Sequence, residues 1–248
     1  MLLSIGGAMV EERSTREGMV LLHGAGLGKW IWHDVAAMLG EGALPIDLPG
    51  RGGGGIDLRE LSFDDYVESV LNEMERSTFE RFVVVGHSIA GLLALRVATL
   101  LRSNVKSVVL IGGAVSSRGR SYAESLPFFS RTMLRFFALM YPRGLRAPDG
   151  VIKKALAHDL TPQQTTTLLE RFVPEAPALF LDPVAWSPPS TITYVRMMGD
   201  RSDLSPALQA RMADRLGAHA KRVDLDGGHL PMLSRPNDLA AILKSELG

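Results

Sequence analysis

The chain has 248 residues, of which 46% are apolar and 22% charged, a balance ordinary for a globular enzyme with a sizeable core. Basic and acidic residues are equal in number, so the net charge of zero gives no electrostatic reason to expect nucleic acid or an acidic membrane as a partner. With no cysteine, the chain has no disulfides, thiolate metal sites or cysteine nucleophiles. At this length an α/β protein commonly forms one domain.

The first residues carry little pattern. Residues 1–17 are compatible with an early hairpin or a loose arm. The segment Met1–Ile5 lacks the basic start of a signal peptide, and no charge-free apolar stretch reaches the length of a membrane span. We therefore expect a cytoplasmic protein that makes no membrane contact.

From residue 19 onward, short apolar runs typical of buried strands alternate with patterns typical of helices. Strands are expected at 19–22, 44–48, 82–85 and 107–111, and helices at 30–39, from Ser62 and from Ile89. This alternation predicts an α/β fold: a mostly parallel, doubly wound sheet with helices on both faces. The glycine run Gly52–Gly55 lacks the Lys-Ser/Thr ending of a phosphate loop, and we interpret it as a flexible connector.

The alternation of strand and helix patterns stops at Ala114 and resumes at Thr191. We predict a core formed by residues 1–114 and 191–248, with a helical cap, residues 115–190, inserted into it. The Phe and Met side chains of the cap have two interpretations: packing onto the core, or an apolar lid over a substrate pocket. The pocket residues expected on the second interpretation are Gly24, Phe128, Phe129, Met133 and Leu230.

One stretch carries the pattern of a nucleophile elbow, G-x-S-x-G with alanine in the last place. A β-branched strand ends at Gly86, Ser88 follows, and Ala90 opens a long apolar helix. A sharp turn between strand and helix exposes the central serine, and small residues two places on either side let the chains pass. The N–H of Ile89 then lies at a helix N-terminus, where it can face a developing oxyanion.

A serine hydroxyl needs a base, and the base needs an orienting group. Three loops that follow strands supply Ser88, an aspartate at 200 or 203, and His229, in the chain order of an α/β-hydrolase triad. Asp200 directly follows Gly199 and is expected to be held at the start of its turn. We therefore favour Asp203, which lies deeper in the loop, as the residue that reaches His229.

With these motifs the chain resembles the α/β-hydrolase superfamily, and within it the plant methylesterase and hydroxynitrile lyase group. The resemblance implies Ser88 as nucleophile, His229 as base, and the N–H groups of Ala25 and Ile89 as the oxyanion hole. Lyase members have Thr in place of Gly24 and a cyanide-binding Lys in place of Leu230, so their absence favours hydrolysis. The matching stretches are 23–25, 30–33, 86–88, 160–180 and 228–236.

The leading hypothesis is a hydrolase that cleaves a small apolar carboxylic ester through an acyl-enzyme. The same residues would serve a thioesterase or a lactonase, and a ligand-binding protein with slow turnover or a cofactor-free lyase would also fit the pattern. We expect no cofactor and no metal, because the remaining histidines have no partners at ligand spacing. The expected partner is a small-molecule ester, and the protein is expected to be a monomer or a homodimer.

Overall fold

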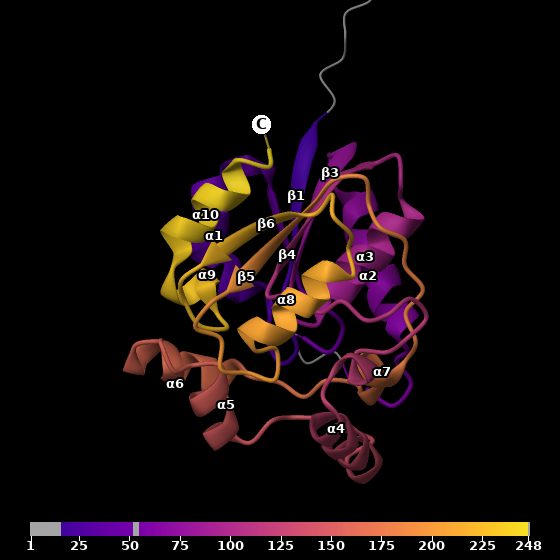
Figure 1. The fold of residues 1–248 in the computed structure, drawn as a ribbon, viewed down its shortest axis with the longest axis vertical. Helices are drawn as coiled ribbons and strands as arrows, with labels where there is room; N and C mark the ends of the chain where they lie inside the picture. Colours follow the sequence, from indigo (N-terminus) through magenta and orange to yellow (C-terminus); the bar gives the residue numbers. More distant parts are fainter. Residues whose placement is uncertain (1–15, 52–54, 248) are drawn as a thin grey trace, which may run out of the picture.

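The computed structural model describes residues 16–51 and 55–247; the predictions for residues 1–15 and for Gly52–Gly54 lie outside the described residues. Within these residues one sheet is formed, with all neighbouring strands parallel and in the order β2-β1-β3-β4-β5-β6 (Figure 1). Its strands are β1 Glu17–Leu22, β2 Ala43–Ile46, β3 Arg81–His87, β4 Val105–Ile111, β5 Ile192–Met197 and β6 Lys221–Leu225.

The helices follow the predicted alternation. They are α1 His33–Leu39, α2 Phe63–Arg76, α3 Ala90–Leu100, α4 Phe128–Met140, α5 Asp149–Ala155, α6 Pro162–Arg171, α7 Pro177–Leu181, α8 Pro206–Asp214, α9 Pro231–Ser234 and α10 Pro236–Lys244. Three short 3-10 turns, Lys29–Trp32, Gly40–Gly42 and Ala123–Ser125, accompany them. Within the described ranges, no helix has the length and apolar character needed to cross a membrane.

Both faces of the sheet are buried, because successive strand residues point to opposite sides. In β3, Val84 packs into the core formed with α2, α3 and α8, whereas Val83 and Val85 pack into the core formed with α1, α9 and α10. Each such fully buried side chain contributes roughly 1.5–3 kcal/mol. The doubly wound α/β fold predicted from the sequence is therefore confirmed.

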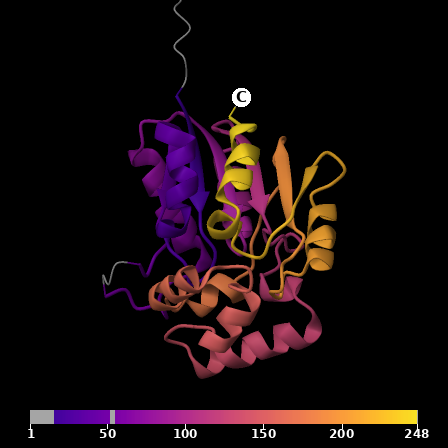
Figure 2. The same cartoon turned by 90° about the vertical axis from the view of Figure 1, so that its left-hand side faces the viewer.

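Helices α4 to α7 lie beyond the carboxyl-terminal edge of the sheet (Figures 1 and 2). They fall within residues 115–190, where the described residues contain helices and two isolated antiparallel bridges, Arg120 with Val184 and Leu145 with Glu175, but no strand. This layer covers the edge at which an open α/β sheet places its ligands. The exact division into core and cap remains a prediction.

Candidate active site

Ser88 stands on the sharp turn between β3 and α3. Its φ of 55° is positive, and it is the one non-glycine residue in the described ranges with that conformation. A Cβ atom at Gly86 would lie 2.4 Å from the Ala90 carbonyl oxygen, and one at Gly91 would lie 2.8 Å from the Ala114 carbonyl oxygen. Only glycine fits at these two positions, which explains how the turn can be so tight. The predicted elbow geometry is present.

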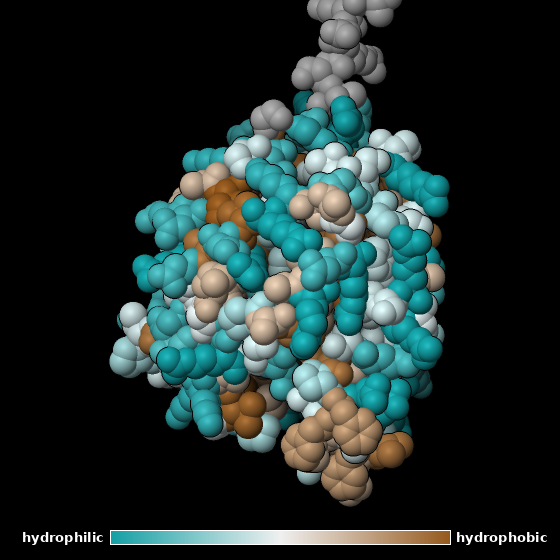
Figure 3. Space-filling model, in the orientation of Figure 1, coloured by the Kyte–Doolittle hydropathy of each residue, from teal (hydrophilic) through white to brown (hydrophobic). Residues whose placement is uncertain are grey.

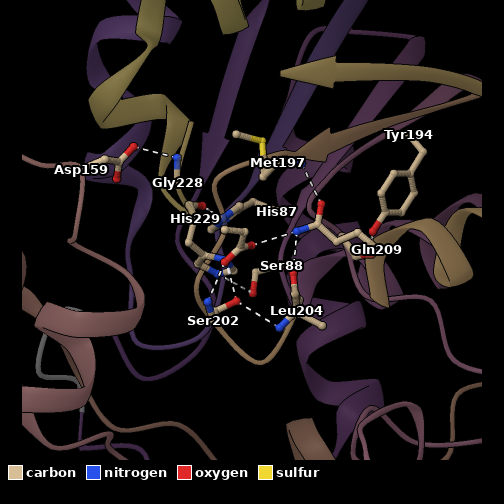
Figure 4. A network of polar contacts seen from close by, with 12 residues as sticks. His87, Ser88, Asp159, Tyr194, Met197, Ser202, Leu204, Gln209, Gly228 and His229 are labelled. Atoms are coloured by element: carbon tan, nitrogen blue, oxygen red, sulfur yellow. Dashed lines mark hydrogen bonds and ion pairs between the residues drawn. The ribbon is translucent and has the colours of Figure 1, made fainter. Parts of the chain in front are cut away.

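His229, in the loop after β6, connects Ser88 to a carboxylate. Its Nε2 lies 3.1 Å from Ser88 Oγ, and its Nδ1 lies 2.8 Å from Asp200 Oδ2 (Figure 4). A carboxylate can only accept a hydrogen bond, so Nδ1 carries the proton and the lone pair of Nε2 faces the serine hydroxyl. His229 and Asp200 are buried, while Ser88 is half-buried. The arrangement can deprotonate a serine at an accessible position.

The prediction that Asp203 orients His229 is wrong. The Asp203 carboxylate accepts a hydrogen bond from Ser130 Oγ on α4, at 3.1 Å. The Gly199 N–H donates to the Gly227 carbonyl at 2.9 Å, so the loops after β5 and β6 run side by side. Asp200, at the start of the turn, is therefore already beside His229. The orienting carboxylate does not have to come from a residue deeper in the loop.

Asp200 is held by two further residues, Ser202 and Gln209, that sequence reasoning did not identify. The Ser202 N–H donates to Oδ1 at 2.8 Å, and Gln209 Nε2 donates to Oδ2 at 2.9 Å. Gln209 is fully buried in α8, and its Oε1 accepts from the Met197 N–H at 2.8 Å (Figure 4). The sequence held one indication of this role: Gln209 is a polar residue beside the apolar stripe of α8, next to Leu208.

These donors set the charge state of the carboxylate. Burial by itself would raise the pKa of Asp200, but the charge and hydrogen bond of His229 and the donors of Ser202 outweigh it. The pKa of Asp200 is consequently lower than the ordinary value. The Asp200 carboxylate therefore stays ionised beside His229, which it orients. It can also stabilise the imidazolium that forms when Ser88 loses its proton.

The loop after β1 passes directly beside the serine. A Cβ atom at Gly24 would lie 2.9 Å from Ser88 Cβ, so only glycine lets this loop approach. In the part of the chain that the structure describes, the N–H groups of Ala25 and Ile89 donate to no protein acceptor. His23 holds the loop through a hydrogen bond that its Nδ1 donates to the Gly24 carbonyl at 2.9 Å.

A buried charged cluster, Arg51, Tyr66 and Glu175, holds the same loop. Glu175, which lies between α6 and α7, accepts from the Gly26 N–H and from the Tyr66 hydroxyl, each at 2.9 Å. Arg51 forms an ion pair with Glu175, and its Nε donates to the Leu27 carbonyl at 2.7 Å. Sequence reasoning missed this cluster, because Arg51 and Glu175 are far apart in the chain and each follows an ordinary turn residue.

Two contacts brace the His229 loop from outside the triad. His87 Nε2 donates to the His229 carbonyl at 2.8 Å, and the Gly228 N–H donates to Asp159 Oδ2 at 2.7 Å (Figure 4). Burial, aided by nearby His229, lowers the pKa of His87 to about 3, so its imidazole is neutral. His87 therefore supports the His229 loop as a neutral hydrogen-bond donor.

The predicted pocket residues are not brought together. Gly24 lies beside Ser88, and Leu230 is buried directly after His229, but Phe128 and Phe129 are 74% and 75% exposed. The prediction that these two phenylalanines line a pocket is wrong, because α4 turns them outward to solvent; Met133 is half-buried. No group of three or more potential metal ligands was found among the described residues, and the expectation of no metal stays a prediction.

Comparisons with known proteins agree with this geometry. Residues 19–242 match the model of the alpha/beta hydrolase family. The carbendazim hydrolyzing esterase of Nocardioides is 25% identical over 89% of this chain and 96% of its own, and the pimeloyl-[acyl-carrier protein] methyl ester esterase of Aromatoleum aromaticum is 28% identical over 92% and 97%. A methylesterase from Arabidopsis shares the fold with a TM-score of 0.76, at 19% identity over 93% of this chain and 98% of its own. Because the family model spans nearly all of the chain and the elbow, histidine and carboxylate stand where such a fold needs them, the protein belongs to the α/β-hydrolase family.

Proposed function

We propose that the protein is a serine hydrolase that cleaves a small apolar carboxylic ester through an acyl-enzyme. The observation that carries the proposal is the continuous contact from Ser88 Oγ through His229 to Asp200, at 3.1 and 2.8 Å. Two relatives with matching length are named for ester hydrolysis, of carbendazim and of a methyl ester. A helical cap over this edge, formed by residues 115–190, would shield the reaction from bulk water.

In the proposed reaction, Ser88 Oγ attacks the ester carbonyl carbon while its proton passes to His229 Nε2. The carbonyl oxygen becomes an oxyanion that the N–H groups of Ala25 and Ile89 stabilise. The C–O bond to the alcohol then breaks, and His229 returns the proton to the departing alkoxide. Water, deprotonated by His229, attacks the acyl-enzyme next, releasing the carboxylic acid and the free Ser88 hydroxyl.

Two features favour hydrolysis over cyanohydrin cleavage. The residue after His229 is Leu230, whose aliphatic side chain offers no cation to a departing cyanide. At Gly24, a Cβ atom would come within 2.9 Å of Ser88 Cβ, so a threonine there would crowd the serine. A thioesterase or a lactonase would use the same residues, and only substrates distinguish these activities from ester hydrolysis.

The test is a panel of methyl, aryl and thio-esters with acyl groups of increasing size, measured with the native protein and with Ser88→Ala. We expect turnover of small apolar esters that falls by about 10⁵-fold in Ser88→Ala. Circular dichroism serves as the control for an intact fold. Near-normal hydrolysis by folded Ser88→Ala would refute the proposal, and so would cyanide release from mandelonitrile faster than any ester cleavage.

A further inference from the structure

Helix α4 and the residues just after it expose an unusual amount of apolar surface. Leu139 is 81% exposed, and only Ala138 of the helix is buried. Figure 3 shows aromatic rings gathered over α4 at the lower edge of the molecule. We call this surface the α4 patch; its exposed members are Phe128, Phe129, Phe136, Phe137, Leu139, Met140 and Tyr141. Contiguous apolar surface of this kind marks an interaction site.

The segment that carries the α4 patch is also strongly basic. Residues 127–148 contain four arginines and no aspartate or glutamate, in a chain whose net charge is zero. Arg131 lies over the Phe128 ring, and Arg146 pairs with Asp149 at 2.8 Å. Arg135 and Arg143 form no ion pair within the described residues, although the charge of Arg143 is near enough to Asp57 to help lower the pKa of that carboxyl. We expected no acidic membrane partner because the net charge of the whole chain is zero. That total does not show the local excess of arginine in residues 127–148.

The shape of the patch and its charge together select the kind of partner. With about 3.6 residues per turn, the exposed apolar positions of α4 cover about half of the helix circumference. A protein groove takes a narrower stripe at i, i+3, i+4 and i+7. If a second copy packed on this patch, residues 127–148 of neither molecule would supply a carboxylate to pair with Arg135 and Arg143. A wide apolar arc flanked by arginines fits the boundary between lipid headgroups and acyl chains.

We propose that the α4 patch docks the protein on an anionic lipid surface. The aromatic and aliphatic side chains enter the headgroup region, and the arginines contact the negatively charged headgroups. Docking of this kind needs no catalysis, so the proposal stands apart from the proposed function. It does place the carboxyl-terminal edge of the sheet, where Ser88 lies, toward the lipid (Figure 1).

The experiment is co-sedimentation of the full chain with vesicles of phosphatidylglycerol and phosphatidylcholine, compared with vesicles of phosphatidylcholine alone. We expect binding to the anionic vesicles that weakens at least about tenfold in high salt or on neutral vesicles. Phe136→Ser/Phe137→Ser should weaken binding at least about tenfold, and Arg135→Gln/Arg143→Gln about fivefold for each arginine. Turnover of a soluble ester by these variants should be unchanged.

Leu100→Ser, an exposed apolar residue at the end of α3, is the matched control and should bind vesicles like the native protein. Ser88→Ala should also bind normally, which separates this proposal from the catalytic one. Light scattering after size exclusion gives the oligomeric state of the same samples. The proposal is overturned if the native protein does not bind anionic vesicles, or if Phe136→Ser/Phe137→Ser binds them as tightly as the native protein does. It is also overturned if the only effect of that variant is to convert a dimer into monomers.

Discussion

Ser88 holds a left-handed backbone conformation that costs a non-glycine residue of order 1–3 kcal/mol. The conformation persists because the surrounding chain fixes it: the Ser88 N–H donates to the Ile111 carbonyl at 3.1 Å, and the Ala114 N–H donates to the Ser88 carbonyl at 2.8 Å. Both partners belong to β4 or the loop after it. The turn that presents the hydroxyl is thus maintained by the sheet itself, and this strain is expected at a functional site.

Substitution of Asp200 and Asp203, one at a time, tests which of them orients His229. Asp200→Asn keeps the shape but allows the imidazole to take the wrong tautomer, so kcat should fall by about 10⁴-fold. Asp203→Asn keeps an oxygen that can accept from Ser130 and should change kcat by less than about tenfold. Steady-state kinetics on one good ester measures both, and a larger loss for Asp203→Asn would return the orienting role to that residue.

Buried neutral histidines make stability depend on pH. Burial, with nearby His229, lowers the pKa of His87 to about 3, and burial, with nearby Arg51, lowers the pKa of His23 well below its ordinary value. In the unfolded chain both titrate near about pH 6.5, so the unfolded state binds more protons below that pH. Their contribution to stability is complete above about pH 6.5 and is lost as pH falls toward the folded-state pKa.

The neutral His87 should therefore cost about 2 kcal/mol of unfolding free energy between pH 7.5 and pH 5, and His23 should add a loss in the same direction. In His87→Gln the amide can still donate to the His229 carbonyl, but the titrating group is gone. Urea unfolding at the two pH values should show a loss for this variant that is about 2 kcal/mol smaller than the loss for the native protein. Equal losses would mean that His87 is not kept neutral by the fold.

At the level of elements, the loop after β1 is held by the segment between α6 and α7. Glu175→Gln leaves Arg51 buried beside a neutral partner, and breaking such a pair costs about 3–5 kcal/mol of stability. The Gly26 N–H also loses a charged acceptor, so the neighbouring Ala25 N–H is less firmly placed. We expect kcat to fall about tenfold or more while KM changes little, because the oxyanion forms only in the transition state.

Arg51→Met/Glu175→Gln removes the unpaired charge and should recover much of the stability without recovering kcat. Arg59→Gln disrupts the exposed ion pair with Asp57 and is the matched control, with little change expected in either quantity. If Glu175→Gln loses stability but keeps kcat, the cluster only holds the fold together and does not position the loop.

The elements that the sequence predicted are those that local patterns determine. The strands at 19–22 and 107–111 appear as β1 and β4, because β-branched and aliphatic runs bounded by glycine can form little else. The helix expected from Ser62 is α2, and Ser62 is its N-cap, in a reciprocal pair with Asp65 in which each side chain accepts from the other's backbone N–H. What the sequence could not determine depends on contacts between distant segments. The path of the loop from Gly199 depends on Gly227, and the outward direction of Phe128 depends on how α4 sits on the core.

At the scale of the whole molecule, the sheet brings together at one edge residues that lie up to 141 positions apart in the chain, Ser88 and His229. This convergence follows from parallel strands whose following loops all emerge at the carboxyl end. It explains why the serine and the histidine could be identified from the sequence, since each lies in a loop that follows an expected strand. The layer of α4 to α7 covers this edge and also carries Glu175 and Asp159, which hold the loops on either side of Ser88.

The proposed hydrolysis requires that Ser88 becomes acylated during ester cleavage. Mixing the native protein with p-nitrophenyl acetate on a millisecond scale should give a burst of p-nitrophenol close to one equivalent per active site, with slower steady turnover after it. Mass spectrometry of the acid-quenched protein should then find one acetyl group on the peptide that contains Ser88, and none in Ser88→Ala. Turnover with no burst and no acetylated Ser88 would show that hydrolysis does not pass through a Ser88 acyl-enzyme.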